Sequence, residues 1–314
     1  MEPLFLQPVF QERIWGGTAL RDMFNYDIPS EKTGECWAIS AHQNGQCIVK
    51  NGKWKNKSLS ELWENQKELF GHLEAEKFPL LTKILDANDD LSVQVHPNDD
   101  YAGKNENVEF GKTECWYVID CQEDAELVYG HNAASKEDAS EMIKNAEWSS
   151  FLRRLKIKPG DFFYVPSGTI HALCKNTIIL ETQQNSDTTY RLYDYDRIDK
   201  DGKKRELHLE KSIDVISAPH QDCENQFSFE KQGSSQITRF VKSQYFTVYK
   251  WDVKDCLSLR QDTFFMLASV IEGEGVLQKE STLFSLRKGD HFILPFDFGD
   301  FVIKGNLQLI VSHA

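Results

Sequence analysis

The sequence lacks long apolar runs, a basic leader and an excess of positive charge. Its longest apolar stretches, such as 162–166 and 307–311, are far too short to cross a bilayer. Residues 1–15 show no basic start followed by an apolar core, so we expect no secretory signal, no membrane partner and a cytoplasmic location. The formal net charge of −13 disfavours a nucleic-acid partner, because the average field repels a phosphate backbone.

Cysteines are few and show no paired pattern. The 314-residue chain has seven of them, an odd number, and none forms a CxxC pair. This pattern argues against a disulfide framework. We expect reduced thiols in a cytosolic protein, most of them buried as small hydrophobic residues.

Helical periodicity is scarce, whereas strand signals are frequent. Aromatic residues make up 12% of the chain, a composition that favours β-structure. Short strand-like runs, separated by Gly, Asn and Asp, predict strands at 36–40, 46–50, 91–96, 114–119, 125–129, 161–166, 177–182 and 189–193. Helical spacing appears at 58–74 and 135–155, behind the cap candidates Ser58 and Ser135. The sequence therefore predicts a mainly β protein, a barrel or sandwich with helical insertions.

An internal repeat divides the chain. Residues 158–171 read KPGDFFYVPSGTIH and residues 287–300 read RKGDHFILPFDFGD, so both have Gly-Asp, an apolar stretch, and Pro six positions after the Gly. Each copy follows a strand–turn–strand segment, at 114–129 and 262–277. We expect two related barrels with a linker within the polar segment 220–240. The alternative is that this pattern is merely a common β-turn.

The first copy of the repeat ends in a histidine. Gly160, Pro166, Gly168 and His171 fit G-x5-P-x-G-x2-H, which resembles the second motif of the cupin superfamily. The fold implied by this resemblance is the double-stranded β-helix, or jelly roll. Its two turns would carry His171 into the mouth of a barrel.

Further polar side chains are expected beside this histidine. In LSVQVHP (91–97), Gln94 and His96 are two residues apart and share one face of a strand, and Glu114 opens a later strand. Unpaired polar groups inside a barrel are costly, and a metal ion would satisfy them. His96, Glu114 and His171, with Gln94 as a candidate fourth ligand, suit Zn²⁺, although Fe²⁺ or Mn²⁺ could use the same set. The alternative is a buried, hydrogen-bonded His–Glu pair beside a packing Gln.

The chain resembles the type I mannose-6-phosphate isomerases, in their shorter bacterial form, in six stretches: FLQPVFQERIWGG (5–17), TGECWAIS (33–40), LSVQVHPNDDYA (91–102), GKTECWYV (111–118), VPSGTIHAL (165–173) and TYRLYDYDR (189–197). The resemblance covers almost all of residues 1–200 and extends more loosely to the C-terminus. Gln94 replaces the first His of the usual H-x-H motif, and a long segment separates His96 from Glu114. Both features distinguish this family from dioxygenase-type cupins.

The resemblance implies a bicupin enzyme that interconverts mannose 6-phosphate and fructose 6-phosphate through an enediolate. It implies one zinc ion per chain, held by Gln94, His96, Glu114 and His171. It implies three catalytic residues in the pocket, Arg191, Lys112 and Glu181. It also implies two residues at the substrate phosphate, Lys83 and Ser92.

The implied chemistry suits these residue types. Moving a carbonyl from C1 to C2 builds negative charge on oxygen, which a Lewis acid and a fixed guanidinium stabilise. Arg191 holds its proton too tightly to act as a base, so a carboxylate, an imidazole or metal-bound water must move the substrate proton. Glu181 is our first choice for that role. The alternative for Arg191 is a surface ion-pair network with its Tyr, Asp and Arg neighbours.

The second copy of the repeat carries no comparable ligands. Aligning the two copies places Asp300 opposite His171 and Met266 approximately opposite Glu114. We therefore expect a metal-binding cupin domain with helical insertions at 1–225, and a cupin-like domain without a metal at 236–314.

Two other functions are compatible with parts of the pattern. A cupin oxygenase using Fe²⁺ would depend on oxygen, and a non-catalytic sugar-binding or regulatory bicupin would bind sugar without turnover. The complete ligand set favours an enzyme acting on a phosphorylated hexose. The sequence carries no signal for an oligomeric state.

Overall fold

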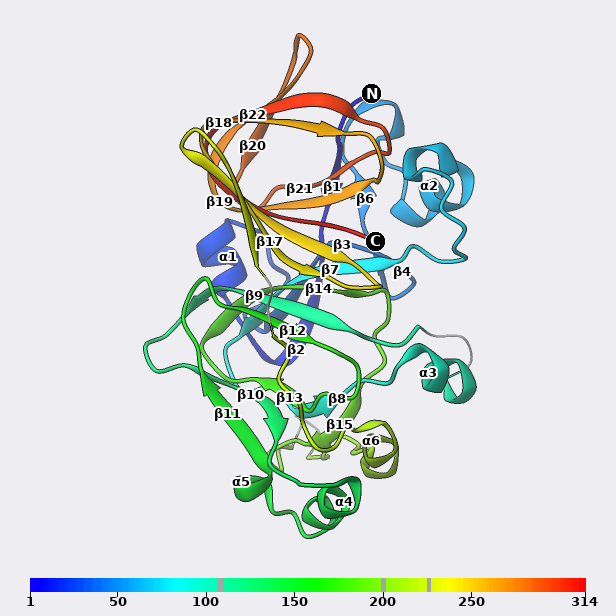
Figure 1. The fold of residues 1–314 in the computed structure, drawn as a ribbon, viewed down its shortest axis with the longest axis vertical. Helices are drawn as coiled ribbons and strands as arrows, with labels where there is room; N and C mark the ends of the chain where they lie inside the picture. The colour runs from blue at the N-terminus through cyan, green and yellow to red at the C-terminus, as the bar shows by residue number, and fades with distance from the viewer. Residues whose placement is uncertain (107–109, 199–201, 225–226) are drawn as a thin grey trace.

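The chain is built mainly of β-strands, as the sequence predicts. The structure, a computed structural model, describes residues 1–106, 110–198, 202–224 and 227–314 (Figure 1). The strands are β1 (Leu4–Gln7), β2 (Val9–Gly17), β3 (Thr33–Ile39), β4 (Ala41–His42), β5 (Gly45–Gln46), β6 (Ile48–Val49), β7 (Leu80–Ala87), β8 (Val93–Val95), β9 (Glu114–Cys121), β10 (Glu126–His131), β11 (Leu152–Lys156), β12 (Phe162–Val165), β13 (His171–Leu173), β14 (Thr177–Gln184), β15 (Tyr190–Tyr193), β16 (Ser228–Gln232), β17 (Ser235–Lys242), β18 (Thr247–Gln261), β19 (Met266–Lys279), β20 (Thr282–Arg287), β21 (His291–Leu294) and β22 (Gly299–His313). Every strand predicted between residues 36 and 193 falls on an observed one, although 46–50 is divided between β5 and β6.

The helices are short. They are α1 (Ala19–Phe24), α2 (Leu59–Asn65), α3 (Asp99–Asn105), α4 (Lys136–Lys144), α5 (Trp148–Phe151) and α6 (Leu209–Val215), with the 3₁₀ helices η1 (Gly52–Trp54) and η2 (Lys67–Phe70). Among the described residues, none of these helices has the length and apolar character needed to span a bilayer.

Both predicted helices end earlier than predicted. Ser58 caps α2 through a capping box with Glu61, and η2 then stops at Gly71, whose φ of +72° ends the helical path. Leu73, which lies within the predicted helix at 58–74 but beyond η2, is 41% exposed. The cap at Ser135 is confirmed, since its side chain accepts from the Asp138 amide, but Leu152–Lys156 forms β11 instead of continuing the helix.

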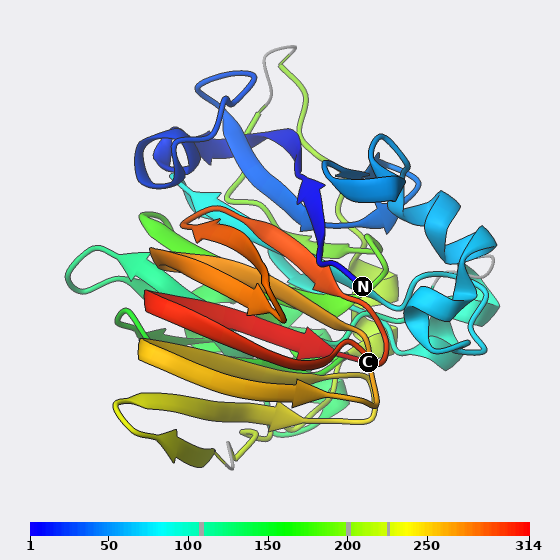
Figure 2. The ribbon, with the colours of Figure 1, turned by 90° about the horizontal axis from the view of Figure 1, so that it is seen from above.

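Three large sheets make up the fold. One has nine strands in the order β16-β17-β18-β22-β19-β21-β1-β6, with β20 paired to β19. The second has the order β12-β9-β14-β7-β3-β2, and the third β11-β10-β13-β8-β15. In Figure 1 the nine-stranded sheet and both termini lie in the upper part, and the five-stranded sheet lies below. The N-terminal strand β1 pairs with β21 of the C-terminal sheet. Figure 2, a view from above, shows β1 beside this sheet.

The six-stranded sheet contributes to two hydrophobic cores. On β9, Cys115 and Tyr117 pack with residues of the nine-stranded sheet, whereas Trp116 and Val118 face the five-stranded sheet. This alternation follows from the two-residue period of a strand. Glu114 shares the face of Trp116, so its carboxylate points between the five- and six-stranded sheets.

The internal repeat has the same backbone geometry in both copies. Gly160 and Gly289 have φ of +92° and +90°, and the Asp that follows each accepts a hydrogen bond from the backbone N–H three residues before it, at 3.0 and 2.9 Å. The cross-strand pairing also corresponds. Glu114 is in register with Val165, and Met266 with Leu294. The strand order β12-β9-β14-β7-β3-β2 recurs as β21-β19-β22-β18-β17-β16.

The prediction of a linker at 220–240 is wrong for its second half. Ser228–Gln232 and Ser235–Lys242 form the antiparallel pair β16–β17 at the edge of the nine-stranded sheet, while residues 225–226 lie outside the described part of the chain. Because the side chains of β16 are mostly exposed, its sequence is polar and resembles a loop. Ser235 is buried and donates to the carbonyl of Cys256.

Aromatic rings join the two halves of the chain. Trp63, Phe70, Phe78 and Phe265 form one cluster with centroid separations of 5.1–6.2 Å. Phe265 belongs to the C-terminal half and is only 4% exposed. The cluster therefore stabilises the contact between the helical segment at α2 and the C-terminal sheet.

We expect Phe265→Ala to lower the free energy of unfolding by about 3–5 kcal/mol, because it removes a buried ring and leaves a cavity. Phe264→Ala is the matched control, since Phe264 is 47% exposed, and we expect a loss of about 1 kcal/mol or less. Denaturant unfolding followed by circular dichroism measures both. Equal losses would contradict the packing role of Phe265.

Candidate metal centre and pocket

Three buried side chains from separate segments meet between the five- and six-stranded sheets. His96 follows β8 directly, Glu114 opens β9 and His171 opens β13. Gln94, on β8, is in register with His171 on one side and with Arg191 on the other. The structure thus brings together the residues that the sequence suggested as metal ligands.

The distances between these side chains suit one metal ion. Nε2 of His96 lies 3.5 Å from Glu114 Oε2, and Nε2 of His171 lies 3.4 Å from Glu114 Oε1. The Gln94 amide is 3.3 Å from His171 Nε2. Ligands about 2.1 Å from a tetrahedral ion lie about 3.4 Å from one another. The ligand atoms of His96, Glu114 and His171 all lie within 4.8 Å of one another, so the three side chains could hold a single small divalent cation.

Backbone carbonyls fix the orientation of both histidines. Nδ1 of His96 lies 2.9 Å from the Thr188 oxygen, and Nδ1 of His171 lies 2.9 Å from the Thr169 oxygen. A carbonyl can only accept, so each Nδ1 donates and each Nε2 presents a lone pair toward Glu114. Burial lowers the pKa of both rings, that of His96 to about 3 with help from the Lys112 ammonium. Neutral imidazoles are the form that binds metals.

Glu114 is a fully buried carboxylate with unsatisfied oxygens. Its one close partner among the described residues, apart from the two histidines, is Lys112, whose Nζ lies 2.8 Å from Oε2 as an ion pair. Neither oxygen accepts a hydrogen bond of good geometry. Burial would raise the pKa of Glu114, but Lys112 and the two histidines hold it well below the usual range. A buried, ionised carboxylate with free lone pairs is well suited to a cation.

A cavity of about 400 Å³ opens next to this cluster. Its lining includes every predicted residue outside the buried His–Glu–His group: Lys83, Ser92, Gln94, Lys112, Glu181 and Arg191. Gln94 and Lys112 belong to both the cluster and the cavity. A molecule in the cavity would therefore lie beside the candidate metal centre.

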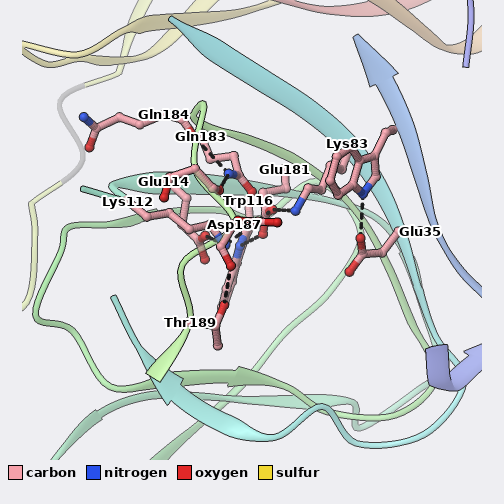
Figure 3. A network of polar contacts seen from close by, with 12 residues as sticks. Glu35, Lys83, Lys112, Glu114, Trp116, Glu181, Gln183, Gln184, Asp187 and Thr189 are labelled. Carbon is pink, nitrogen blue, oxygen red and sulfur yellow. Dashed lines mark hydrogen bonds and ion pairs between the residues drawn. The ribbon is translucent and has the colours of Figure 1, made fainter. Parts of the chain in front are cut away.

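Glu181 lies between two lysines in this cavity. Its Oε1 is 3.6 Å from Lys83 Nζ and 4.0 Å from Lys112 Nζ, and its Oε2 accepts from the Trp116 indole at 3.1 Å. Figure 3 shows Lys112, Glu181 and Lys83 following one another across the site. Burial and the nearby Glu114 carboxylate raise the pKa of Glu181 despite the lysines. This carboxyl group therefore binds a proton more readily than an exposed glutamate does.

Arg191 is hydrogen-bonded to neutral groups and takes no part in the ion pairs of the described residues around it. Its Nε donates to Ser92 Oγ at 3.3 Å and its Nη1 to the Glu206 carbonyl at 3.0 Å. Nearby, Asp194 is bound by Arg197 and Arg205, so the predicted ion-pair network exists among its neighbours. Among the described residues, no carboxylate lies within ion-pair distance of Arg191. Its charge is directed toward the cavity by neutral partners.

Sequence reasoning missed several cavity residues. Glu35, Trp37, Asp187, Arg205 and His208 line the cavity but are not among the predicted site residues. Glu35 could have been found, since it is two residues before Trp37 on the same strand face. Asp187, Arg205 and His208 gave no such signal, because irregular segments bring them to the cavity.

Comparison with known proteins gives a single family. The model of the type I phosphomannose isomerase catalytic domain matches residues 4–119, and that of the mannose-6-phosphate isomerase cupin domain matches residues 236–314. The chain is 58% identical over 312 residues to the mannose-6-phosphate isomerase ManA of Bacillus subtilis, covering 99% of both chains. It is 51% identical over 313 residues to the mannose-6-phosphate isomerase of Streptococcus mutans, covering 100% of this chain and 98% of that protein.

Solved structures give the same picture. A crystal structure of the mannose 6-phosphate isomerase from Bacillus subtilis superimposes with a TM-score of 0.98 at 57% identity, covering 100% of both chains. A phosphomannose isomerase from Salmonella typhimurium shares the fold with a TM-score of 0.82 at 17% identity, covering 100% of this chain and 99% of that one.

Proposed function

The chain belongs to the type I mannose-6-phosphate isomerase family, and from this membership we propose that it interconverts mannose 6-phosphate and fructose 6-phosphate as a zinc-dependent aldose–ketose isomerase. The observation that carries the proposal is the buried group of His96, Glu114 and His171 beside a cavity large enough for a hexose phosphate. The free state of all seven cysteines supports action in the cytoplasm.

We further propose that the fold is a bicupin. The division is a metal-binding domain at 1–225 and a domain without a metal at 236–314, with β1 and β6 of the first domain completing the sheet of the second. The shared turn geometry and strand order of the two copies support this division. In the second copy, Met266 stands where Glu114 stands in the first, and Asp300 forms an exposed ion pair with Arg260.

Gln94, His96, Glu114 and His171 are the proposed zinc ligands. The amide of Gln94 can turn its oxygen toward the ion, because O and N exchange places on rotation. The separations of 3.3–3.5 Å between neighbouring groups and the lone pairs on both Nε2 atoms support zinc at this place. When bound, the ion would supply a Lewis acid that stabilises negative charge on a substrate oxygen.

The remaining proposed roles belong to side chains of the cavity. Arg191 would orient the substrate and stabilise the enediolate, because its guanidinium is held by neutral partners and keeps its full charge. Glu181, whose pKa is raised, would carry the proton between C1 and C2. Lys112 would balance the negative charge of Glu114 and Glu181 as the reaction proceeds.

The substrate phosphate is assigned to Lys83 and Ser92. Ser92 is favourably placed, since its hydroxyl already contacts Arg191 at the cavity wall. Lys83 is 5% exposed, lies 3.6 Å from Glu181 and sits 5.1 Å from the centre of the Trp37 ring. The charge of Lys83 is therefore partly neutralised by Glu181. We expect substitution of Lys83 to change turnover more than substrate affinity.

The proposed function predicts metal-dependent turnover. Purified protein should convert mannose 6-phosphate to fructose 6-phosphate, lose this activity after treatment with a chelator and regain it with Zn²⁺. A coupled assay for fructose 6-phosphate measures the rate. Chelator-insensitive turnover would exclude a metal role, a requirement for oxygen would favour a cupin oxygenase, and sugar binding without turnover would favour a regulatory protein.

A further inference from the structure

Four side chains form a row across the inner face of the six-stranded sheet. Trp37 on β3 is in register with Lys83 on β7, Lys83 with Glu181 on β14, and Glu181 with Trp116 on β9. Glu114 lies two residues before Trp116 on the same strand face, next to one end of the row. The row therefore connects the candidate metal centre to β3.

Glu35 lies beside the other end of this row. It is two residues before Trp37 on β3, and its side chain is 10% exposed, at the cavity wall. Arg13 binds both carboxylate oxygens, with Nε and Nη2 each at 3.0 Å, and the Trp37 indole donates to Oε2 at 2.6 Å. Figure 3 shows Glu35 and Glu181 on either side of Lys83. Three N–H donors on two rigid side chains, Arg13 and Trp37, thus hold this carboxylate in one place.

Charges alternate along the path from the surface to the metal centre. The order is Arg13, Glu35, Lys83, Glu181, Lys112 and Glu114, in which each neighbouring pair is within ion-pair distance except Glu35 and Lys83, which interact electrostatically over a longer distance. Burial would raise the pKa of Glu35, but Lys83 and Arg13 lower it to about 2, which keeps it ionised. In a buried, low-dielectric site each charge affects the position and protonation of the next one. The Lys83 ammonium therefore interacts electrostatically with two carboxylates, and that of Glu181 is the closer.

We propose that Glu35 is a positioning residue for isomerisation, which acts through Lys83 by sharing its ammonium between two carboxylates. This inference rests on the proposed function and on the proton-transfer role of Glu181. Without the charge of Glu35, Lys83 keeps the carboxylate of Glu181, at 3.6 Å, as its one ion-pair partner among the described residues. It then closes on Oε1 of Glu181 and opposes the uptake of a proton there.

The first test is Glu35→Gln, which keeps an acceptor for the Trp37 indole but removes the charge. We expect kcat to fall by about tenfold or more while KM changes by less than about twofold, because the substrate does not need Glu35 for binding. Zinc content should stay unchanged. Glu35→Asp, which keeps the charge, should recover most of the rate. Glu12→Gln, an exposed neutralisation next to Arg13, is the matched control and should leave kcat unchanged.

A double-mutant cycle separates action through Lys83 from a local packing role. In a Lys83→Met background, Glu35→Gln should change kcat by less than about twofold. Equal fold-losses in both backgrounds, or a Glu35→Asp variant as slow as Glu35→Gln, would overturn the inference, as would an unchanged kcat in Glu35→Gln. Wild-type protein without isomerase turnover would instead refute the proposed function itself, so the two failures are distinguishable.

Discussion

Replacement of His171 with alanine is expected to release the metal ion and abolish most of the turnover. The imidazole is 1% exposed, its Nδ1 is fixed by the Thr169 carbonyl, and its Nε2 points at Glu114. Even groups that merely orient a metal ligand cost about 10–100-fold in metal affinity when they are lost, and a direct ligand costs more. We expect zinc affinity to fall by more than about 100-fold, with a matching loss of activity at limiting zinc.

His291 provides the matched control, because it is equally buried in the second copy of the repeat. Its Nδ1 lies 2.9 Å from Ser269 Oγ and its Nε2 lies 2.7 Å from Tyr26 Oη, and no metal-ligand group of the described residues includes it. His291→Ala should lower the unfolding temperature but retain one zinc per chain. Elemental analysis after dialysis measures the metal. Full zinc in His171→Ala, or equal loss in both variants, would refute the ligand assignment.

Arg191→Ala should lower kcat by about 100- to 1,000-fold while leaving zinc content intact. The guanidinium is placed at the cavity by Ser92 and the Glu206 carbonyl, without a carboxylate of the described residues to neutralise it. Under the proposed mechanism, removing it would take away a fixed positive charge where negative charge would develop in the enediolate. It leaves Glu114 and the two histidines untouched.

Arg197→Ala is the control for Arg191, since Arg197 lies in the same strand-and-turn segment but binds Asp194 and does not line the cavity. We expect it to affect the unfolding temperature more than kcat. Steady-state kinetics, zinc analysis and thermal unfolding of both variants distinguish the roles. If Arg191→Ala unfolded while Arg197→Ala retained activity and stability, Arg191 would be a structural residue.

Sequence patterns predicted the structural features that depend on residues close together in the chain. Two-residue spacing placed Gln94 and His96 on one strand face, and the Gly-Asp turn predicted the same geometry at Gly160 and Gly289, which the structure confirms. The pattern failed at β16, where exposed polar side chains on an edge strand resemble a linker. It also failed at 152–156, where a helical period ran on into a strand.

The sequence by itself determined the residue types at the site, the turns that precede them and the strand faces they occupy, because these depend on local backbone geometry. The tertiary structure alone decided which charged side chains lie close enough to interact with one another. The pairing of β3, β7 and β14 sets Glu35, Lys83 and Glu181 on adjacent strands, and no local pattern specifies that register. The same holds for β1, whose four residues become part of the C-terminal sheet through pairing with a strand almost three hundred positions away. Distances between remote residues follow from how the sheets pack, and that is a property of the whole folded chain.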